Sequence, residues 1–256
     1  MSGPGGLHAV IFDVDGTLVD SERDGHRVAF NRAFEEFELP YRWSVEEYGE
    51  LLHVTGGQRR IAGYLEAQGL DAVERERLAP ALHARKTEII ATLVDDGQVL
   101  VRPGAHRLLD ELSACGVRLA VATTGSRSWV DRLLRRLLPE VHFEVVVTGD
   151  EVKNLKPDPE AFVVALDRLD TTPAHAVVVE DSGEGLRAAH GAGLRCVVVV
   201  NDYTADHDLG AAELVLSGFG DPGSPARVLG GAAEMSCDGV LDVATLASLV
   251  SVDLGA

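Results

Sequence analysis

The chain has 256 residues, enough for one large α/β domain or for a core with a smaller insertion. Its formal net charge is -18, from 23 Lys and Arg residues against 41 Asp and Glu residues. Because a field of this sign repels phosphate backbones and anionic lipids, we exclude nucleic acids and membrane surfaces as partners, and an anionic substrate would need a local cationic site.

The first residues, Met1–Gly6, carry neither a basic leader nor an apolar signal segment, and no later apolar run is long enough to cross a membrane. Three cysteines, Cys115, Cys196 and Cys237, form no close pair and no zinc-site spacing. We therefore expect reduced thiols in the core of a cytoplasmic protein. As a separate expectation, we take the protein to be a monomer.

Short apolar runs along the chain are typical of strands buried on both faces of a parallel sheet. These runs are Leu7–Phe12, Val117–Ala122, Val145–Val147, Ala176–Val179 and Cys196–Val200. Helical patterns follow the later runs, over Arg127–Leu138, Pro159–Leu169 and Gly183–Ala192. This alternation predicts an α/β fold with a doubly wound, Rossmann-like parallel sheet between two helical layers.

The stretch from Ser21 to about residue 98 has apolar residues at helical spacing only, and Arg102-Pro103-Gly104 marks the return to the core. We predict a helical cap of about four helices at 21–100, inserted into a core formed by 1–20 and 101–256. The alternative is a helical domain with a packing role only.

The C-terminal part of the chain is less informative. A cluster of turn-forming residues at 217–225 predicts that the sheet ends there. Asp242–Val250 has a weak amphipathic pattern and is expected to form a helix on the core. No function can be assigned from the sequence to the tail after residue 225.

Two carboxylates, Asp13 and Asp15, follow the first run, at the end of the strand where open α/β sheets bind ligands. Two such groups cannot easily both stay ionised beside a phosphate dianion, so a metal neutralises one while the other tends to keep a proton. The pair therefore predicts a nucleophile and an acid. For the motif taken alone, the alternative is an ordinary turn after a strand.

Three further strand ends carry groups that suit the same chemistry. Thr123 ends the second run and can donate a hydrogen bond to a phosphoryl oxygen, and Lys156 stands on a proline-framed loop before a helix. Glu180 and Asp181 follow a fully apolar run and suit a hard cation such as Mg²⁺. Each has a plainer explanation alone, as a strand threonine, a solvated lysine or a helix cap. Four strand ends equipped in this order make coincidence a poor explanation.

The order and local sequence of these motifs resemble the haloacid-dehalogenase superfamily. The resemblance implies that Asp13 attacks phosphorus in line and forms an aspartyl phosphate. Asp15 would protonate the leaving alcohol and then take a proton from the hydrolytic water. Thr123 and Lys156 would be the remaining catalytic groups.

The same resemblance implies that Mg²⁺ lies between Asp13, the backbone carbonyl of Asp15, Asp181 and a phosphoryl oxygen. Glu180 would bind the ion directly or through one further contact. Both Mg²⁺ and Lys156 should be needed, because the carboxylates and the phosphate dianion would otherwise repel one another at contact distance. Dehalogenases need neither the second acid nor a metal, so these residues argue against dehalogenation.

The position of the cap resembles that of β-phosphoglucomutase and its phosphatase relatives, which implies phosphosugar substrates. The segments that look like CbbY-type proteins are 20–31, 48–52, 55–57, 83–88, 203–206 and 220–222. This resemblance covers most of the chain apart from the C-terminal tail. It implies a phosphatase that removes xylulose-1,5-bisphosphate, an inhibitor of Rubisco.

A bisphosphate needs a second anion site, which cations and glycine N–H groups of the cap would supply. An acid and a histidine of the cap would contact sugar hydroxyls, and a second core hydroxyl would lie nearby. The substrate-binding candidates are Glu22, His26, Gly56, Gly57, Arg60, Lys86 and Thr124. For each cap residue, the alternative is a surface position on a helix.

One departure from the CbbY-type pattern concerns Gln58, where relatives commonly have Lys, and the following pair, in which Arg60 matches and Arg59 does not. Either Arg59 replaces the lost charge or the specificity has shifted. Two other functions stay open: a β-phosphoglucomutase-like mutase or a phosphatase for another small phosphosugar, and a non-catalytic sugar-phosphate sensor. The sensor predicts erosion of at least one motif, and none is eroded.

Overall fold

The computed structural model describes residues 4–54, 56–231 and 237–251. The chain forms two compact units, which are treated in turn. The first comprises Met1–Val19 and Val101–Ala256, and the second comprises Asp20–Leu100.

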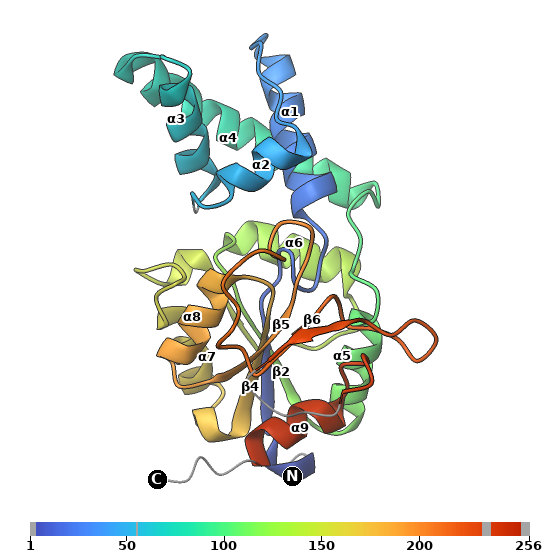
Figure 1. The fold of residues 1–256 in the computed structure, drawn as a ribbon. Helices are drawn as coiled ribbons and strands as arrows, with labels where there is room; N and C mark the ends of the chain where they lie inside the picture. Colours follow the sequence, from blue (N-terminus) through green and yellow to red (C-terminus); the bar gives the residue numbers. More distant parts are fainter. Residues whose placement is uncertain (1–3, 55, 232–236, 252–256) are drawn as a thin grey trace. The chain divides into compact units, whose positions relative to one another are not determined.

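The larger unit is built on a seven-stranded sheet with the order β3-β2-β1-β4-β5-β6-β7 among the described residues (Figure 1). The strands are β1 Ala9–Phe12, β2 Arg118–Ala122, β3 Val145–Val147, β4 Ala176–Glu180, β5 Arg195–Val199, β6 Leu214–Leu216 and β7 Val228–Gly230. All neighbouring pairs from β3 to β6 are parallel. Each predicted apolar run overlaps one of the first five strands, with ends that differ by at most two residues, so the predicted parallel α/β fold is confirmed.

The prediction that the sheet ends at 217–225 is wrong. The turn-forming segment returns the chain to the sheet, where β7 pairs antiparallel with β6 through Val215 opposite Gly230 and Leu216 opposite Val228. The backbone N–H of Ser217 donates to the carbonyl of Arg227 at 3.0 Å. The strand escaped prediction because its three residues are all exposed, and so it lacks a buried apolar pattern.

Helices cover the sheet on both sides. Those of the core are α5 Ala105–Ala114, α6 Arg127–Leu137, α7 Glu160–Arg168, α8 Gly183–Gly191 and α9 Val243–Ser251, with short helical turns η1 Pro4–Gly6, η3 Gly149–Glu151 and η4 Pro173–His175. Phe162 of α7 and Leu186 of α8 pack with Ile11 and Val178 in one apolar cluster. Figure 1 shows α5 and α9 on the opposite side of the sheet from α7 and α8, and α9 contacts both β4 and α5.

The second unit is helical, as predicted for the inserted segment. Its elements are the π-helical turn η2 Glu22–His26 and the helices α1 Arg27–Glu36, α2 Val45–Leu51, α3 Gly57–Ala67 and α4 Ala72–Asp95. Ser44 and Asp71 cap α2 and α4 by accepting backbone N–H groups of Glu47 at 3.1 Å and Glu74 at 2.9 Å.

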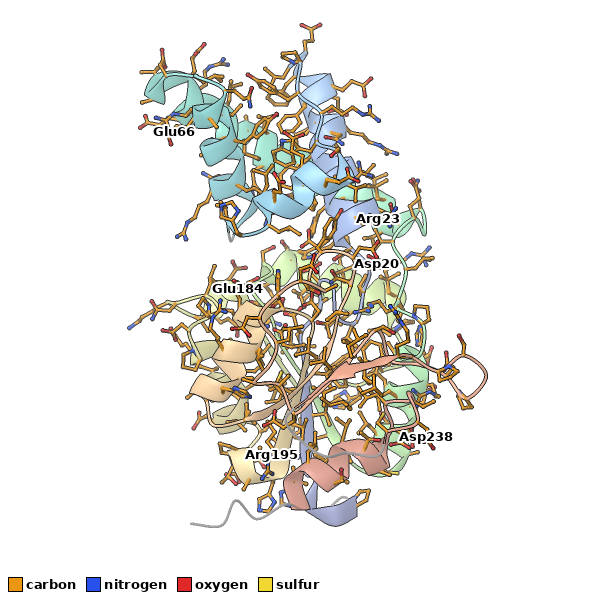
Figure 2. The ribbon with its side chains drawn as sticks, in the orientation of Figure 1. Asp20, Arg23, Glu66, Glu184, Arg195 and Asp238 are labelled. Carbon is orange, nitrogen blue, oxygen red and sulfur yellow. The ribbon has the colours of Figure 1, made fainter. Side chains whose placement is uncertain are left out.

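An aromatic core holds this insert together. The ring centroid of Trp43 lies 4.8 Å from that of Phe30 and 4.9 Å from that of Phe34. Charged side chains lie on its outside, such as Glu66 of α3, which is labelled in Figure 2 and is paired with Arg75 at 2.8 Å. The insert therefore has an apolar core of its own.

The expectation that all three thiols lie in the core is wrong. Cys196 is buried in β5, Cys237 is partly buried and Cys115 is exposed. Cys115 is the C-cap of α5, just before Gly116 with its positive φ of 73°, so it lies where the apolar face of the helix has ended. None of the helices in the described parts of the chain is long and apolar enough to cross a membrane.

Candidate active site

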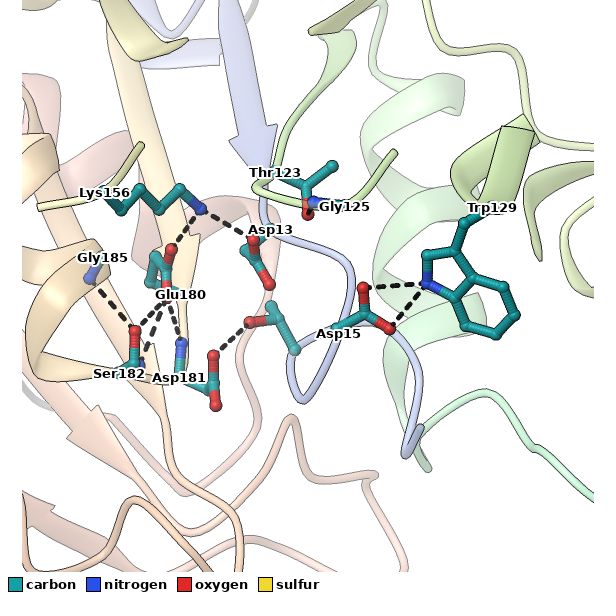
Figure 3. Close-up of polar contacts among 11 residues, drawn as sticks. Asp13, Asp15, Thr123, Gly125, Trp129, Lys156, Glu180, Asp181, Ser182 and Gly185 are labelled. Carbon is teal, nitrogen blue, oxygen red and sulfur yellow. Dashed lines mark hydrogen bonds and ion pairs between the residues drawn. The ribbon is translucent and has the colours of Figure 1, made fainter. Parts of the chain in front are cut away.

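Four of the predicted side chains meet at the carboxyl ends of β1 and β4 (Figure 3). These two strands are neighbours, with Phe12 opposite Val179, and the backbone N–H of Asp13 donates to the Val179 carbonyl at 3.1 Å. The residues that follow therefore lie side by side. Carboxylate oxygens of Asp13, Glu180 and Asp181 all lie within 4.8 Å of one another, and all three residues are buried.

Lys156 joins two of these carboxylates. Its Nζ lies 2.7 Å from Asp13 Oδ1 and 2.5 Å from Glu180 Oε1, and its side chain is 5 % exposed. The stem packs against α7, where Nζ lies 4.9 Å from the centroid of the Phe162 ring. Lys156 is thus a buried cation between the predicted nucleophile and an acid of the next strand.

The second oxygen of Glu180 is also engaged, because Oε2 accepts the backbone N–H of Asp181 at 2.9 Å and the N–H and hydroxyl of Ser182 at 3.3 and 3.2 Å. Gly185 makes room for this carboxylate: a Cβ at that position would lie 1.9 Å from Glu180 Cδ. Because one oxygen of Glu180 is paired with the Lys156 cation and the other accepts three donors, Glu180 is arranged to orient Lys156 more than to bind an ion directly.

Asp181 is oriented by two side chains that the sequence did not single out. Thr17 Oγ1 donates to Asp181 Oδ1 at 3.1 Å, and Asn201 Nδ2 donates to Asp181 Oδ2 at 2.7 Å. Gly16 has a φ of 86°, and a Cβ there would lie 2.6 Å from Asp181 Oδ2. The signals were present, since Thr17 belongs to the first motif and Asn201 follows the fifth apolar run at the same edge of the sheet.

The side chain of Asp15 points elsewhere. Trp129 Nε1 of α6 lies 3.1 Å from both Asp15 oxygens. Figure 3 shows this carboxylate turned away from Asp13 toward the indole. Trp129 was missed because it reads as an apolar residue of an amphipathic helix, and it is 7 % exposed.

The two threonines after β2 differ in their surroundings. Thr123 is buried, and its Oγ1 accepts the backbone N–H of Gly125 at 3.2 Å. Its own N–H donates to the carbonyl of Val147 in β3 at 3.1 Å, so the hydroxyl stays at the edge of the sheet. Thr124 is exposed.

The electrostatics of this cluster suit a cation. Burial raises the pKa of Asp13 to about 7, against the opposing effect of Lys156 and with a further rise from Glu180. Burial also raises the pKa of Asp181 well above its usual range, helped by repulsion from Glu180 and Asp13. For Lys156, burial works against the charged form, yet the attraction of Asp13 and Glu180 raises its pKa.

Three buried carboxylates with one bonded lysine leave negative charge that burial makes costly. Carboxylate oxygens are the ligands that Mg²⁺ prefers. The hydrogen bonds from Thr17 and Asn201 fix the orientation of the Asp181 carboxylate, as outer contacts commonly do for a metal ligand. The residues present therefore fit a magnesium ion. Asp13 and Asp181 are the side chains best placed to hold it.

Within the insert, three of the predicted substrate contacts lie around Tyr48 and Phe30. Tyr48 donates its hydroxyl proton to Glu22 Oε2 at 2.5 Å and accepts from Arg60 Nη1 at 3.2 Å. Arg60 also donates through Nε to the Leu51 carbonyl at 3.0 Å, and Lys86 Nζ lies 4.8 Å from the centroid of the Phe30 ring.

Arg60 and Lys86 are 8 % and 7 % exposed, so the alternative of a surface charge does not hold for these two cations. Burial lowers the pKa of His83, with further lowering from Lys86, His26 and Arg60, so these side chains lie near one another.

The other candidates of the insert lie at the start of α3. Gly56 has a φ of 93° and is the N-cap of this helix, and a Cβ on Gly57 would lie 2.9 Å from His83 Cδ2. Gln58 and Arg59 are both exposed, in contrast to Arg60.

Comparisons with known proteins agree with the motifs. Residues 10–199 match the sequence model of the haloacid dehalogenase-like hydrolases. The chain is 41 % identical to the protein CbbY of Cereibacter sphaeroides over 223 residues, which are 86 % of this chain and 96 % of that one. It is 36 % identical to a phosphorylated carbohydrates phosphatase of Thermotoga maritima, over 82 % of this chain and 94 % of that protein.

A solved structure is similar as well. CbbY from Rhodobacter sphaeroides in complex with xylulose-(1,5)bisphosphate is 40 % identical, with a TM-score of 0.74 over 83 % of this chain and 94 % of that one. The family match spans more than half of the chain, and it contains the strand ends that carry Asp13, Lys156 and Asp181. The chain therefore belongs to the haloacid dehalogenase-like hydrolases, and among them it is a CbbY-like protein.

Proposed function

We propose that this protein is a Mg²⁺-dependent phosphatase of small phosphosugars that uses Asp13 as its nucleophile. The observation that supports it best is the buried contact of Lys156 with both Asp13 and Glu180, beside the oriented carboxylate of Asp181. This arrangement keeps an attacking carboxylate next to a fixed cation at the edge of the sheet where ligands bind.

In the proposed reaction an oxygen of Asp13 attacks the phosphorus atom, and the bond from phosphorus to the sugar oxygen breaks. Lys156 favours the ionised form of Asp13, which burial alone would disfavour, and it stays close enough to offset charge on a phosphoryl group. Thr123 would donate its hydroxyl proton to a phosphoryl oxygen. When bound by Asp13 and Asp181, Mg²⁺ would neutralise part of the charge shared by these carboxylates and the phosphoryl group.

Asp15 supplies the protons. It protonates the leaving sugar oxygen in the first half of the reaction and takes a proton from water in the second half, when the aspartyl phosphate on Asp13 is hydrolysed. One residue thereby serves both directions of proton transfer.

The proposed substrate is xylulose-1,5-bisphosphate, which is the ligand of a CbbY structure 40 % identical to this chain. Removing it would relieve inhibition of Rubisco, the role that the CbbY resemblance implies. A second phosphate suits the buried cations of the insert, Arg60 and Lys86, and Glu22 and His26 are the candidates for sugar hydroxyls. The backbone N–H groups of Gly56 and Gly57 and the hydroxyl of Thr124 complete the proposed contacts.

The decisive experiment is release of phosphate with Mg²⁺ present. It compares kcat/KM for xylulose-1,5-bisphosphate, ribulose-1,5-bisphosphate, fructose-1,6-bisphosphate and β-glucose-1-phosphate, with EDTA as the control. A strong preference for the first compound supports the proposed substrate. Preference for another phosphosugar keeps the chemistry and directs attention to Gln58 and Arg59.

Two further outcomes of this assay correspond to the alternative functions. Conversion of β-glucose-1-phosphate to an isomeric phosphate without release would identify a mutase. Absence of Mg²⁺-dependent turnover for every phosphosugar would favour a non-catalytic sensor.

A further inference from the structure

Asp15 stands apart from the other carboxylates of the site. Its two oxygens each lie 3.1 Å from Trp129 Nε1, whereas the carboxylates that gather within 4.8 Å of one another are those of Asp13, Glu180 and Asp181. An N–H shared between both oxygens leaves the carboxylate oriented as an acceptor toward the indole. In this orientation it faces α6 and not the nucleophile (Figure 3).

The loop between β2 and α6 is shaped around this contact. A Cβ on Gly125 would lie 3.2 Å from Trp129 Cδ1 and 3.4 Å from Asp15 Oδ2, so a side chain there would crowd the indole and touch the carboxylate. The same glycine donates its N–H to Thr123 Oγ1 at 3.2 Å. The indole and the hydroxyl proposed to bind phosphate are therefore held by one short segment of chain.

We propose that Trp129 is a positioning residue whose indole N–H holds the Asp15 carboxylate turned away from Asp13, and that Asp15 must leave the indole and take up a proton from solvent before it protonates the leaving sugar oxygen. This inference rests on the proposed function, in which Asp15 is the acid and base. Rotation about the Cα–Cβ bond of Asp15 would exchange the indole for the reacting oxygen. The strength of the N–H contact then sets the fraction of molecules in which the acid is ready.

A spectroscopic experiment tests the contact without turnover. The chain has two tryptophans, so Trp43→Phe leaves Trp129 as the sole indole N–H, visible as one ¹⁵N–¹H NMR signal. Adding Asp15→Ala should move this signal in the ligand-free protein. Saturating Mg²⁺ and orthovanadate should move the signal of the Asp15-containing protein toward its position in the Asp15→Ala variant.

Two results would overturn the proposal. One is an indole signal that is the same with and without Asp15, because the contact would then be absent in solution. The other is a signal that stays in place although vanadate binding is seen by calorimetry, because Asp15 would then remain on the indole. Neither result depends on phosphosugar hydrolysis, so the proposed function can fail independently.

A kinetic experiment separates positioning from packing. In Trp129→Phe, kcat/KM for the best phosphosugar should rise up to about tenfold, since the hydrogen bond that holds Asp15 away from the reacting oxygen has been removed from the resting state. With 4-nitrophenyl phosphate, whose leaving group needs no proton, the change should stay within about twofold.

The matched control is Val130→Ala, which loosens the packing of α6 at a fully buried neighbour of Trp129. It should change both substrates by the same factor. Equal changes for both substrates in Trp129→Phe, or a selective fall for the phosphosugar, would contradict the proposal.

Discussion

The two compact units bury charge of opposite sign, and each does so with a different kind of scaffold. In the core, three carboxylates at adjacent strand ends share contacts with Lys156, Thr17 and Asn201. In the insert, Arg60 and Lys86 are buried on helices, and the Tyr48 hydroxyl joins Arg60 to the carboxylate of Glu22. The gathered carboxylates of the core suit a cation, and the buried cations of the insert offer charged hydrogen-bond donors to an anion such as phosphate.

In the proposed function, the core carries the chemistry and the insert recognises the substrate. The positions of the core groups follow from strand register, which places Asp13 beside Glu180. The positions of the insert groups follow from the packing of helices around an aromatic core. Changes in the core cluster should therefore alter rate and metal binding, whereas changes in the insert should alter the choice of substrate.

The largest effect is expected for Asp13→Asn. The amide keeps the shape and can still accept from Lys156, but it cannot act as the nucleophile, so kcat should fall by about 10⁴-fold. The unfolding midpoint in EDTA should not fall, because a buried carboxylate whose pKa is raised has been neutralised. Phosphate release and thermal unfolding measure the two effects, and wild-type rates in this variant would refute the assignment of the nucleophile.

The second prediction concerns pH and the metal-free protein. The pKa of Asp13 is about 7 in the folded chain, above the ordinary value of 3.8. The folded chain therefore binds a proton at Asp13 more tightly than the unfolded chain does. Stability from this group is fully present below the ordinary pKa and is lost as pH rises through about 7. In EDTA, the free energy of unfolding should fall by about 2 to 3 kcal/mol between about pH 5 and pH 8.

Magnesium should reverse this loss, because a cation bound by Asp13 and Asp181 stabilises their ionised forms. Urea unfolding at several pH values, with Mg²⁺ or with EDTA, provides the measurement. Asp13→Asn is the control, since its EDTA curve should be flatter. A wild-type stability that rises with pH in EDTA would contradict the charge balance deduced for the core.

The insert is tested by Arg60→Gln, with Arg59→Gln as the matched control on the same helix. Arg60 is buried and bonded to Tyr48, whereas Arg59 is exposed. Loss of the buried cation should raise KM for a sugar bisphosphate about tenfold, the equivalent of about 1.4 kcal/mol, with kcat nearly unchanged. Arg59→Gln should change KM by less than about twofold.

A monophosphate substrate is the matching test, because it has no second phosphate for Arg60 to bind. Its KM should be equal in Arg60→Gln and in the wild type, and circular dichroism should verify that the insert stays folded. An equal rise in KM for bisphosphate and monophosphate would show that Arg60 does not recognise a second phosphate.

The core cluster could be predicted because its three carboxylates stand at the ends of apolar runs and Lys156 stands in the loop after another run. In a parallel sheet the carboxyl ends of the strands meet at one edge, so Asp13, Lys156, Glu180 and Asp181 could be brought together without any structure. Sequence reasoning failed for Trp129, whose contact depends on the path of the loop before α6. It also failed for β7, because the turn-forming residues before it gave no indication that the chain re-enters the sheet.

The smallest effect is expected outside both clusters, at Glu151. Burial tends to raise its pKa, but hydrogen bonds from Arg168 and Thr148 and the charge of Arg127 outweigh it and lower the pKa to about 2. The bonds include Arg168 Nη1 at 2.8 Å and the backbone N–H of Thr148 at 3.0 Å. This stabilisation is present above the ordinary pKa and is lost as pH falls from about 4.5 through about 2.

Glu151→Gln should therefore lower the free energy of unfolding by about 1 kcal/mol at neutral pH, a value kept small by solvent screening. The difference from the wild type should shrink as pH falls toward about 2, the reverse of the pH dependence expected for Asp13 in EDTA. Urea unfolding of both proteins across this range measures it. The free energy of unfolding should change with pH in opposite directions for the two residues. Glu151, which accepts several hydrogen bonds, would then stabilise the fold when ionised, whereas Asp13, which lies among other carboxylates, would need a bound cation. If the difference between Glu151→Gln and the wild type is instead constant with pH, the whole effect comes from packing. The charge of Glu151 would then contribute nothing to the free energy of unfolding.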